Sequence, residues 1–129
     1  MMELYEKYVG LVFDNRYRIE RVIGIGGMAI VFKATDLLMR RVVAVKILKD
    51  EISEDEQSVK RFENESRAVS ILNHKNIVKV FDVALNDDLY YIVMEYLNGI
   101  TLKQYINQQG HLGWRETLYF LSQILDALQ

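Results

Sequence analysis

The stretch Gly24-Ile-Gly-Gly-Met-Ala29-Ile-Val31, followed by the apolar segment Val43-Ala-Val-Lys46, decides how this sequence folds and what it binds. Three glycines stand between two runs rich in β-branched residues, which is typical of a turn that joins two strands. Because glycine has no Cβ, backbone N–H groups in such a turn can approach an anion closely. The lysine at the end of the next apolar run supplies a cation. The order and spacing therefore predict a site for the phosphates of a nucleotide.

The glycine turn has two other interpretations. One is a loose hairpin turn without a ligand. The other is a dinucleotide-binding turn, because Gly24, Gly26 and Ala29 also fit the pattern G-x-G-x-x-G/A. That pattern must open a helix whose N-terminus receives a pyrophosphate. Residues 30–35 are Ile-Val-Phe-Lys-Ala-Thr, which favours a strand. The dinucleotide interpretation is therefore disfavoured.

The remaining patterns predict an α+β fold. We expect strands at 17–23, 30–35, 41–48, 77–84 and 89–95, a helix from a capping box at Ser53 and Glu56 to about Leu72, and short helices near 101–108 and 114–128. A polar turn is expected at Asn86-Asp-Asp, and Asn98-Gly99 breaks the chain again. This spacing is too close for repeated βαβ units, so the sheet is expected to be antiparallel.

Lys46 is expected on a strand face suited to a nucleotide. The strand period places it beside Ala44, with Val43, Val45 and Ile47 on the opposite face. A small residue leaves room for a planar ring, and a lysine next to it suits a phosphate. The alternative is a lysine whose stem packs against the sheet while its amine reaches water.

Glu65 is the expected partner of Lys46. It falls near the middle of an apolar helical stripe, whereas Glu63 lies roughly 120° away, on the solvent side. The stripe consists of Val59, Phe62, Val69 and Leu72. A carboxylate buried without a partner costs several kcal/mol, so a buried contact with Lys46 is expected. In the alternative, the stripe is shallow and Glu65 only lies at its rim.

Composition excludes several classes of protein. A net charge of −2 with interspersed signs disfavours nucleic acid as a partner. The absence of Cys excludes disulfides and thiolate metal sites, which favours a cytoplasmic location. The N-terminus lacks the order of a signal peptide, and the longest apolar runs are too short to cross a bilayer. His74 and His111 are interpreted as structural, so no metal ligand is expected.

Five stretches in register resemble the N-terminal lobe of eukaryotic-type (Hanks) protein kinases, and most of all bacterial Ser/Thr kinases with PASTA repeats. They are Ile23-Gly-Ile-Gly-Gly-Met-Ala-Ile-Val31, Val43-Ala-Val-Lys46, Arg61-Phe-Glu-Asn-Glu65, Leu72-Asn-His-Lys-Asn-Ile-Val78 and Tyr91-Ile-Val-Met-Glu-Tyr-Leu-Asn-Gly-Ile-Thr-Leu102. The resemblance implies an N-terminal extension at 1–16 and an ATP-binding N-lobe at 17–97, with a five-stranded antiparallel sheet and one αC-type helix. Residues 98–129 would begin a helical C-lobe and leave it incomplete.

The resemblance also assigns roles to residues. Lys46 would bind the α- and β-phosphates of ATP, and Glu65 would pair with Lys46 in the active state. Met94 would be the gatekeeper, while Glu95 and Leu97 would offer backbone groups to the adenine. The residues expected around the nucleotide are Ile23, Gly24, Gly26, Gly27, Met28, Ala29, Val31, Ala44, Lys46, Met94, Glu95 and Leu97. Ala29 replaces the third glycine, and Lys75 stands where a proline is usual.

The catalytic motifs of kinases do not occur in these 129 residues. There is no H-R-D, no D-F-G and, without proline, no A-P-E. The aspartate that receives the substrate's proton and the Mg²⁺ ligands would lie in the missing part of the C-lobe. We therefore expect the ATP-binding part of a kinase that phosphorylates protein Ser or Thr, and expect this chain alone to be inactive. The alternative is a non-catalytic, pseudokinase-like regulatory or dimerisation module.

Three further expectations concern partners and location. The resemblance implies a homodimer through the N-lobe and a parent protein anchored by one transmembrane helix downstream of this cytoplasmic part. In the last helix, Leu118, Leu121, Leu125 and Leu128 recur at helical spacing. A second lobe would bury this face in a whole kinase. In the isolated chain we expect it to be open and to drive self-association.

Overall fold

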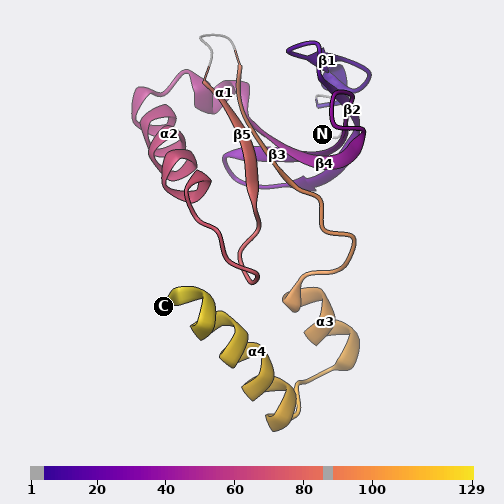
Figure 1. Cartoon of the computed structure of the whole chain (residues 1–129), viewed down its shortest axis with the longest axis vertical. Coiled ribbons are helices and arrows are strands. Elements are labelled where there is room, and N and C mark those ends of the chain that lie inside the picture. Colours follow the sequence, from indigo (N-terminus) through magenta and orange to yellow (C-terminus); the bar gives the residue numbers. More distant parts are fainter. Residues whose placement is uncertain (1–4, 86–88) are drawn as a thin grey trace. The chain divides into compact units, whose positions relative to one another are not determined.

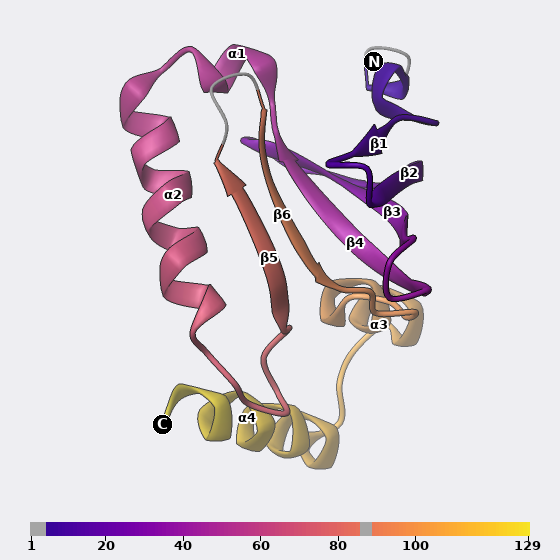
Figure 2. The same cartoon turned by 45° about the horizontal axis from the view of Figure 1, so that its top comes forward.

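The alternating segments form one antiparallel sheet in the computed structural model, which describes residues 5–85 and 89–129. Five of its strands are β2 (Tyr17–Ile25), β3 (Ala29–Asp36), β4 (Arg41–Leu48), β5 (Val80–Leu85) and β6 (Tyr90–Glu95). The strand order is β1-β2-β3-β4-β6-β5, and every pair is antiparallel (Figures 1 and 2). The α+β class is confirmed. The turn expected at Asn86-Asp-Asp lies outside the described residues.

A sixth strand, β1 (Val12–Phe13), comes from the N-terminal extension and was not expected. It pairs with the start of β2 through a tight turn at Asp14 and Asn15, which have φ values of 53° and 56°. The Arg16 N–H closes this turn on the Phe13 carbonyl at 2.9 Å. Asp and Asn tolerate this left-handed conformation better than most residues. Two residues are too few to show an alternating pattern, so the strand gave no signal in the sequence.

The two faces of the sheet carry different packing. Val43, Val45 and Ile47 lie in one buried cluster with Phe32 and Val93, as the alternation predicted. On the other face Leu48 and Ile92 pack against Phe62 of helix α2 (Glu56–Ser70). Figures 1 and 2 show α2 alongside β5. The sheet therefore has an aliphatic and aromatic core on one side and a face that α2 covers in part on the other.

The helix before β5 begins differently from the prediction. A short helix, α1 (Asp50–Ser53), comes first, and the Ser53 hydroxyl donates to the Asp50 carbonyl within it. The N-cap of α2 is Asp55, whose carboxylate accepts from the Gln57 N–H. The predicted capping box at Ser53 and Glu56 was wrong, because aspartate is an equally good cap and stands directly before the helix.

The described chain divides into two compact units. The first contains the sheet, α1 and α2 (Met1–Leu72 and Lys79–Tyr96), and the second contains α3 (Leu102–Gln109), α4 (Trp114–Leu128) and the segment Asn73–Val78. Thr101 and Gln104 form a reciprocal capping box at the start of α3. Within the second unit, Asn76 Nδ2 donates to the Gln123 carbonyl at 2.9 Å. Both helices lie where the sequence predicted them, to within one residue.

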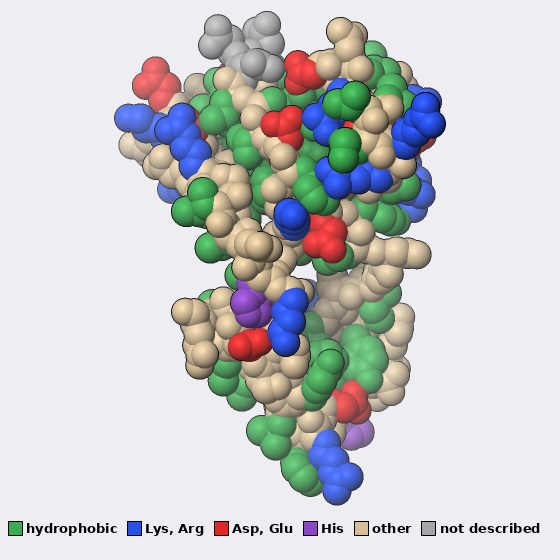
Figure 3. All heavy atoms as spheres, in the orientation of Figure 1, with side chains coloured by type: hydrophobic (Ala, Val, Ile, Leu, Met, Phe, Trp, Pro, Cys, Tyr) green, Lys and Arg blue, Asp and Glu red, His purple; other side chains and the backbone are tan. Residues whose placement is uncertain are grey.

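Within residues 5–85 and 89–129, no helix combines the length and the hydropathy needed to span a bilayer. Nor do three or more metal-binding side chains gather anywhere in the described part. Figure 3 shows acidic and basic side chains interspersed on the visible face.

Candidate functional site

The strand register brings the glycine turn and the lysine into one row across the sheet. Gly24 pairs with Val31, Val31 pairs with Lys46, and Lys46 pairs with Ile92. In the next row on the same face, Ala44 pairs with Met94. Cross-strand neighbours in an antiparallel sheet point to the same face. Val31, Lys46, Ala44 and Met94 therefore share the face that carries α2.

A cavity of about 330 Å³ lies on this face of the first unit. Its floor comes from strands β3, β4, β5 and β6, and its wall comes from α2. The lining residues are Val31, Lys46, Phe62, Glu65, Ser66, Val69, Val80, Ile92 and Met94. The cavity thus brings Lys46 and Glu65 together with two of the residues expected around the purine. Most of the lining is apolar, with one cation and one carboxylate.

The expected buried contact between Lys46 and Glu65 does not form. No ion pair joins them within 4.0 Å in the described part of the chain, and Glu65 is exposed while Lys46 is half-buried. The side of α2 that packs on the sheet is centred on Phe62 and Ser66. Glu63, expected in solvent, is half-buried and pairs with Arg67.

Ser66 explains the error in the predicted stripe. It is polar and was left out, yet it is 1% exposed, because its hydroxyl donates to the Phe62 carbonyl at 2.5 Å within the helix. Leu72 was included, although it lies beyond the end of α2 and is 45% exposed. Including Ser66 and removing Leu72 turns the packed stripe away from Glu65 and toward Glu63.

The glycine turn is tight, but its glycines do not adopt the left-handed conformation that glycine favours. The Gly26 N–H donates to the Ala29 carbonyl at 2.8 Å, and a Cβ at Gly26 would stand 3.3 Å from that oxygen. None of Gly24, Gly26 and Gly27 has a positive φ. A Cβ at Gly27 would meet no atom of the chain. The missing Cβ therefore matters within the turn mainly at Gly26, where the Ala29 carbonyl lies close.

The turn is also tied to the end of β4. The Met28 carbonyl accepts from the Lys49 N–H at 2.9 Å. The Met28 side chain is half-buried against the cluster that contains Leu48. These contacts connect the middle of the glycine turn to the strand that carries Lys46.

The remaining predicted site residues differ in exposure. Ala44 and Ala29 are buried, while Ile23 and Glu95 are exposed. The Glu95 N–H donates to the Lys79 carbonyl at 2.8 Å, so this donor is already used within the chain. Leu97 belongs to the second unit and is exposed.

Lys33 is a second lysine on the sheet face of the cavity, although it does not line the cavity itself. It pairs with Ala44 and therefore lies on the face of Val31 and Lys46. Its ammonium lies 5.5 Å from the centre of the Tyr96 ring, within range of a cation–π interaction. The strand period counted from Val31 would have placed it there.

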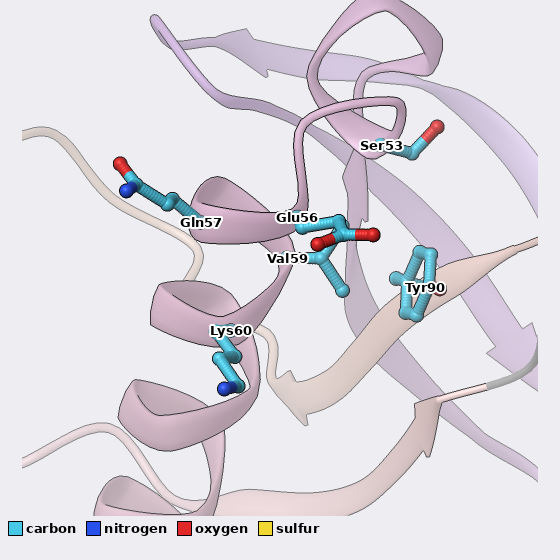
Figure 4. A pocket seen from close by; sticks show the side chains of 6 residues that line it. All are labelled: Ser53, Glu56, Gln57, Val59, Lys60 and Tyr90. Atoms are coloured by element: carbon cyan, nitrogen blue, oxygen red, sulfur yellow. The ribbon is translucent and has the colours of Figure 1, made fainter.

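A second hollow, of about 380 Å³, lies at the start of α2 and does not include Lys46. In Figure 4, Glu56 and Val59 point toward Tyr90, and Gln57 points away from it. Ser53 and Lys60 complete the lining. Unlike the first cavity, it includes neither Lys46 nor Glu65.

Comparisons with known proteins show the family of the chain. The family model described as protein kinase domain matches residues 17–129. The chain is 45% identical over 120 residues to the serine/threonine-protein kinase PrkC of Bacillus subtilis, covering 93% of this chain and 18% of that protein. It is 41% identical over 121 residues to a probable serine/threonine-protein kinase, PknB, of Lactococcus lactis, covering 93% of this chain and 19% of the relative.

Solved structures give the same result. The crystal structure of the PknI kinase domain of Mycobacterium tuberculosis superposes with a TM-score of 0.79 at 26% identity. The match covers 92% of this chain and 48% of that domain. The chain spans about a fifth of the length of the curated relatives it matches. On the family match and the kinase fold of its sheet, the chain belongs to the protein kinase domain family.

Proposed function

We propose that this chain is the ATP-binding portion of a serine/threonine protein kinase. The whole protein would transfer the γ-phosphoryl group of ATP to Ser or Thr hydroxyls of other proteins. The observation that carries the proposal is the row that joins Gly24, Val31 and Lys46 next to a cavity of about 330 Å³. The names of the bacterial relatives support the choice of Ser and Thr as substrates.

Each part of the site has a proposed role. The backbone N–H groups of Gly27 and Met28 in the middle of the turn would face the phosphates, and the Lys46 ammonium would bind the α- and β-phosphates. Val31 and Ala44 would enclose the purine, with Ile23 above it and Met94 at the back. These groups position ATP and neutralise charge, which is most of what a protein supplies to phosphoryl transfer.

Glu65 is proposed to reach Lys46 only in the active arrangement. Both side chains line the same cavity, so a rotation of α2 that turns Glu65 inward would close the gap between them. The ion pair would then fix the direction of the Lys46 amine. The exposed carboxylate described here fits an arrangement in which that rotation has not occurred.

Mg²⁺ is proposed to accompany ATP, where it would neutralise the charge of the phosphates. The described residues hold no cluster of three metal-binding side chains, so none of them is assigned as a ligand. We further propose that residues 1–16 are an N-terminal extension, 17–97 the N-lobe, and 98–129 the beginning of the helical C-lobe.

The proposal is tested by titrating MgATP into the 129-residue chain and following backbone amide shifts by NMR, which detects even weak binding. The amides of Gly26, Gly27 and Ala44 are expected to shift. Lys46→Met is expected to weaken binding by about tenfold or more, because it removes a charge-assisted contact with phosphate. Lys60→Met is the matched control, since it removes a lysine from the second hollow.

Two outcomes would contradict the proposal: shifts confined to the second hollow, or equal affinity in the Lys46 variant. The chain alone is also expected to show no phosphotransfer above background with γ-labelled ATP. If it binds ATP and the protein that contains it shows no transfer either, the non-catalytic, pseudokinase-like role replaces the enzyme.

A further inference from the structure

Residues 5–13, called here the N-terminal segment, pack over the end of β4 on the face opposite α2. Tyr8 is the buried tyrosine of this segment, and only 9% of its surface is exposed. Its ring meets Phe13 and Phe32 edge to face, with centroids 6.2 and 5.9 Å apart. Its hydroxyl donates to Asp50 Oδ1 at 3.0 Å, and the Lys7 ammonium pairs with the other carboxylate oxygen. A phenol and an ammonium thus converge on one aspartate.

Asp50 lies where the chain has little local stabilisation, at the start of a very short helix. It is the first residue of α1, and the preceding residue, Lys49, provides no side-chain cap. A helix of four residues is too short to be stable by itself. The Lys49 ammonium also lies 5.9 Å from the centre of the Tyr5 ring. The N-terminal segment therefore contacts both residues of the β4–α1 junction, Lys49 and Asp50.

This junction is the point to which the glycine turn is tied. The Lys49 N–H donates to the Met28 carbonyl in the middle of that turn. Lys46 lies three residues earlier on the same strand. Any displacement of the junction would move the glycine turn relative to Lys46. It would therefore change the distance between the backbone N–H groups of the turn and the Lys46 ammonium, the groups proposed to face the phosphates.

We propose that the N-terminal segment is a brace that holds the glycine turn over Lys46, with Tyr8 and Asp50 as positioning residues for the nucleotide. The contacts run from Tyr8 to Asp50, through the backbone of Lys49, to Met28. A turn that is already held in place loses less conformational freedom when ATP binds, which raises affinity. The inference deepens the proposed function and rests on it for its effect on ATP.

The matched pair Tyr8→Phe and Tyr17→Phe isolates this role. Both changes remove one tyrosine-to-aspartate hydrogen bond on the same face of the sheet, because the Tyr17 hydroxyl donates to Asp82 at 2.9 Å. Only Tyr8 lies next to the β4–α1 junction. Asp50→Asn is a second variant, which keeps the shape of the side chain and removes its charge.

The first measurement is amide hydrogen exchange in the 129-residue chain, at a temperature where every variant is folded. Tyr8→Phe and Asp50→Asn are expected to speed exchange of the Lys49 amide by about fivefold relative to the amides of β6, as the loss of one hydrogen bond would. Tyr17→Phe is expected to leave this ratio unchanged. An unchanged ratio in the Tyr8 variant, or an equal rise in the Tyr17 variant, overturns the brace.

The second measurement is the affinity for MgATP in the NMR titration. Tyr8→Phe is expected to weaken binding by about threefold or more, and Tyr17→Phe by less than about twofold. If Tyr8→Phe speeds exchange of the Lys49 amide but leaves the affinity for MgATP unchanged, the segment only stabilises the fold, and the proposal fails. If the unaltered chain binds no ATP, the proposed function fails, and the exchange ratio still decides whether the junction is braced.

Discussion

Tyr17 illustrates how a single buried hydroxyl contributes to this fold. It is 1% exposed, and its hydroxyl donates to Asp82 on β5. Burial is the main cause that raises the pKa of Tyr17 to about 12, and the bond to the aspartate adds to it. The folded chain therefore favours the neutral phenol more strongly than the unfolded chain does.

The sign of the resulting pH dependence follows from linkage. In the unfolded chain the phenol ionises near pH 10, while in the folded chain it remains protonated up to about pH 12. Stability is thus fully present below pH 10 and declines as the pH rises toward 12. We expect the Tyr17 contribution, up to about 3 kcal/mol, to disappear across this window.

Urea unfolding at a series of pH values measures this effect. Tyr17→Phe is expected to flatten the alkaline decline, whereas Tyr119→Phe, which removes an exposed phenol on α4, should not. Parallel declines in the Tyr17 variant and the unaltered chain would show that the buried phenol is not responsible.

At the scale of elements, the strands could be predicted from the sequence far better than the packing of α2. Strand β4 has the predicted bounds, because it is rich in Val and Ile and lies between charged residues, with Lys46 as its one charged interior residue. The orientation of α2 could not be predicted, since a polar residue, Ser66, satisfies its own hydroxyl within the helix and is buried. No apolar pattern can reveal such a residue.

In the candidate site, too, the strand residues could be predicted from the sequence and the helix packing could not. The strand period placed Ala44 and Lys46 on one face in advance, whereas Val31 was expected beside Ala44 only from the resemblance; the register puts all three on that face. The distance between Lys46 and Glu65 depends on how α2 is rotated, which is a property of tertiary packing. The N-terminal segment was missed for a related reason: its contacts with Asp50 join residues about forty positions apart that no local pattern links.

The start of α2 provides a prediction at this scale. Asp55→Ala is expected to destabilise the first unit by about 1 kcal/mol, because it removes the side chain that caps the helix. Ser53→Ala, at the position where the cap was first expected, should cost less than about half of that. Urea unfolding of both variants measures the difference. A larger loss with Ser53→Ala would show that the cap has been assigned to the wrong residue.

At the scale of the whole molecule, four leucines of α4 form an exposed apolar row in the second unit. Leu118, Leu121, Leu125 and Leu128 are all exposed by about half or more. On another side of the helix, Phe120 packs edge to face with Tyr105 of α3, at 5.7 Å between centroids. The packed side holds the helix pair together, and the leucines have no cover within the described chain.

We therefore expect the isolated chain to self-associate through α4. Sedimentation velocity at rising concentration should show association in the unaltered chain and a shift toward monomer in the double variant Leu121→Gln, Leu125→Gln. Leu38→Gln, which changes an exposed leucine in the turn between β3 and β4, is the control. A monomer at all concentrations without any substitution would refute this expectation.

The segment Asn73–Val78 lies in sequence between α2 and β5, yet it belongs to the helical unit. There the Asn76 side chain donates a hydrogen bond to the Gln123 carbonyl of α4. The polypeptide therefore passes from one unit to the other three times. Severing the peptide bond after Tyr96 would not by itself release the C-terminal helices, because the N-terminal fragment keeps the residues that hold them. For the same reason, residues 97–129 produced alone would lack part of their own unit and would be a poor choice of boundary for expression.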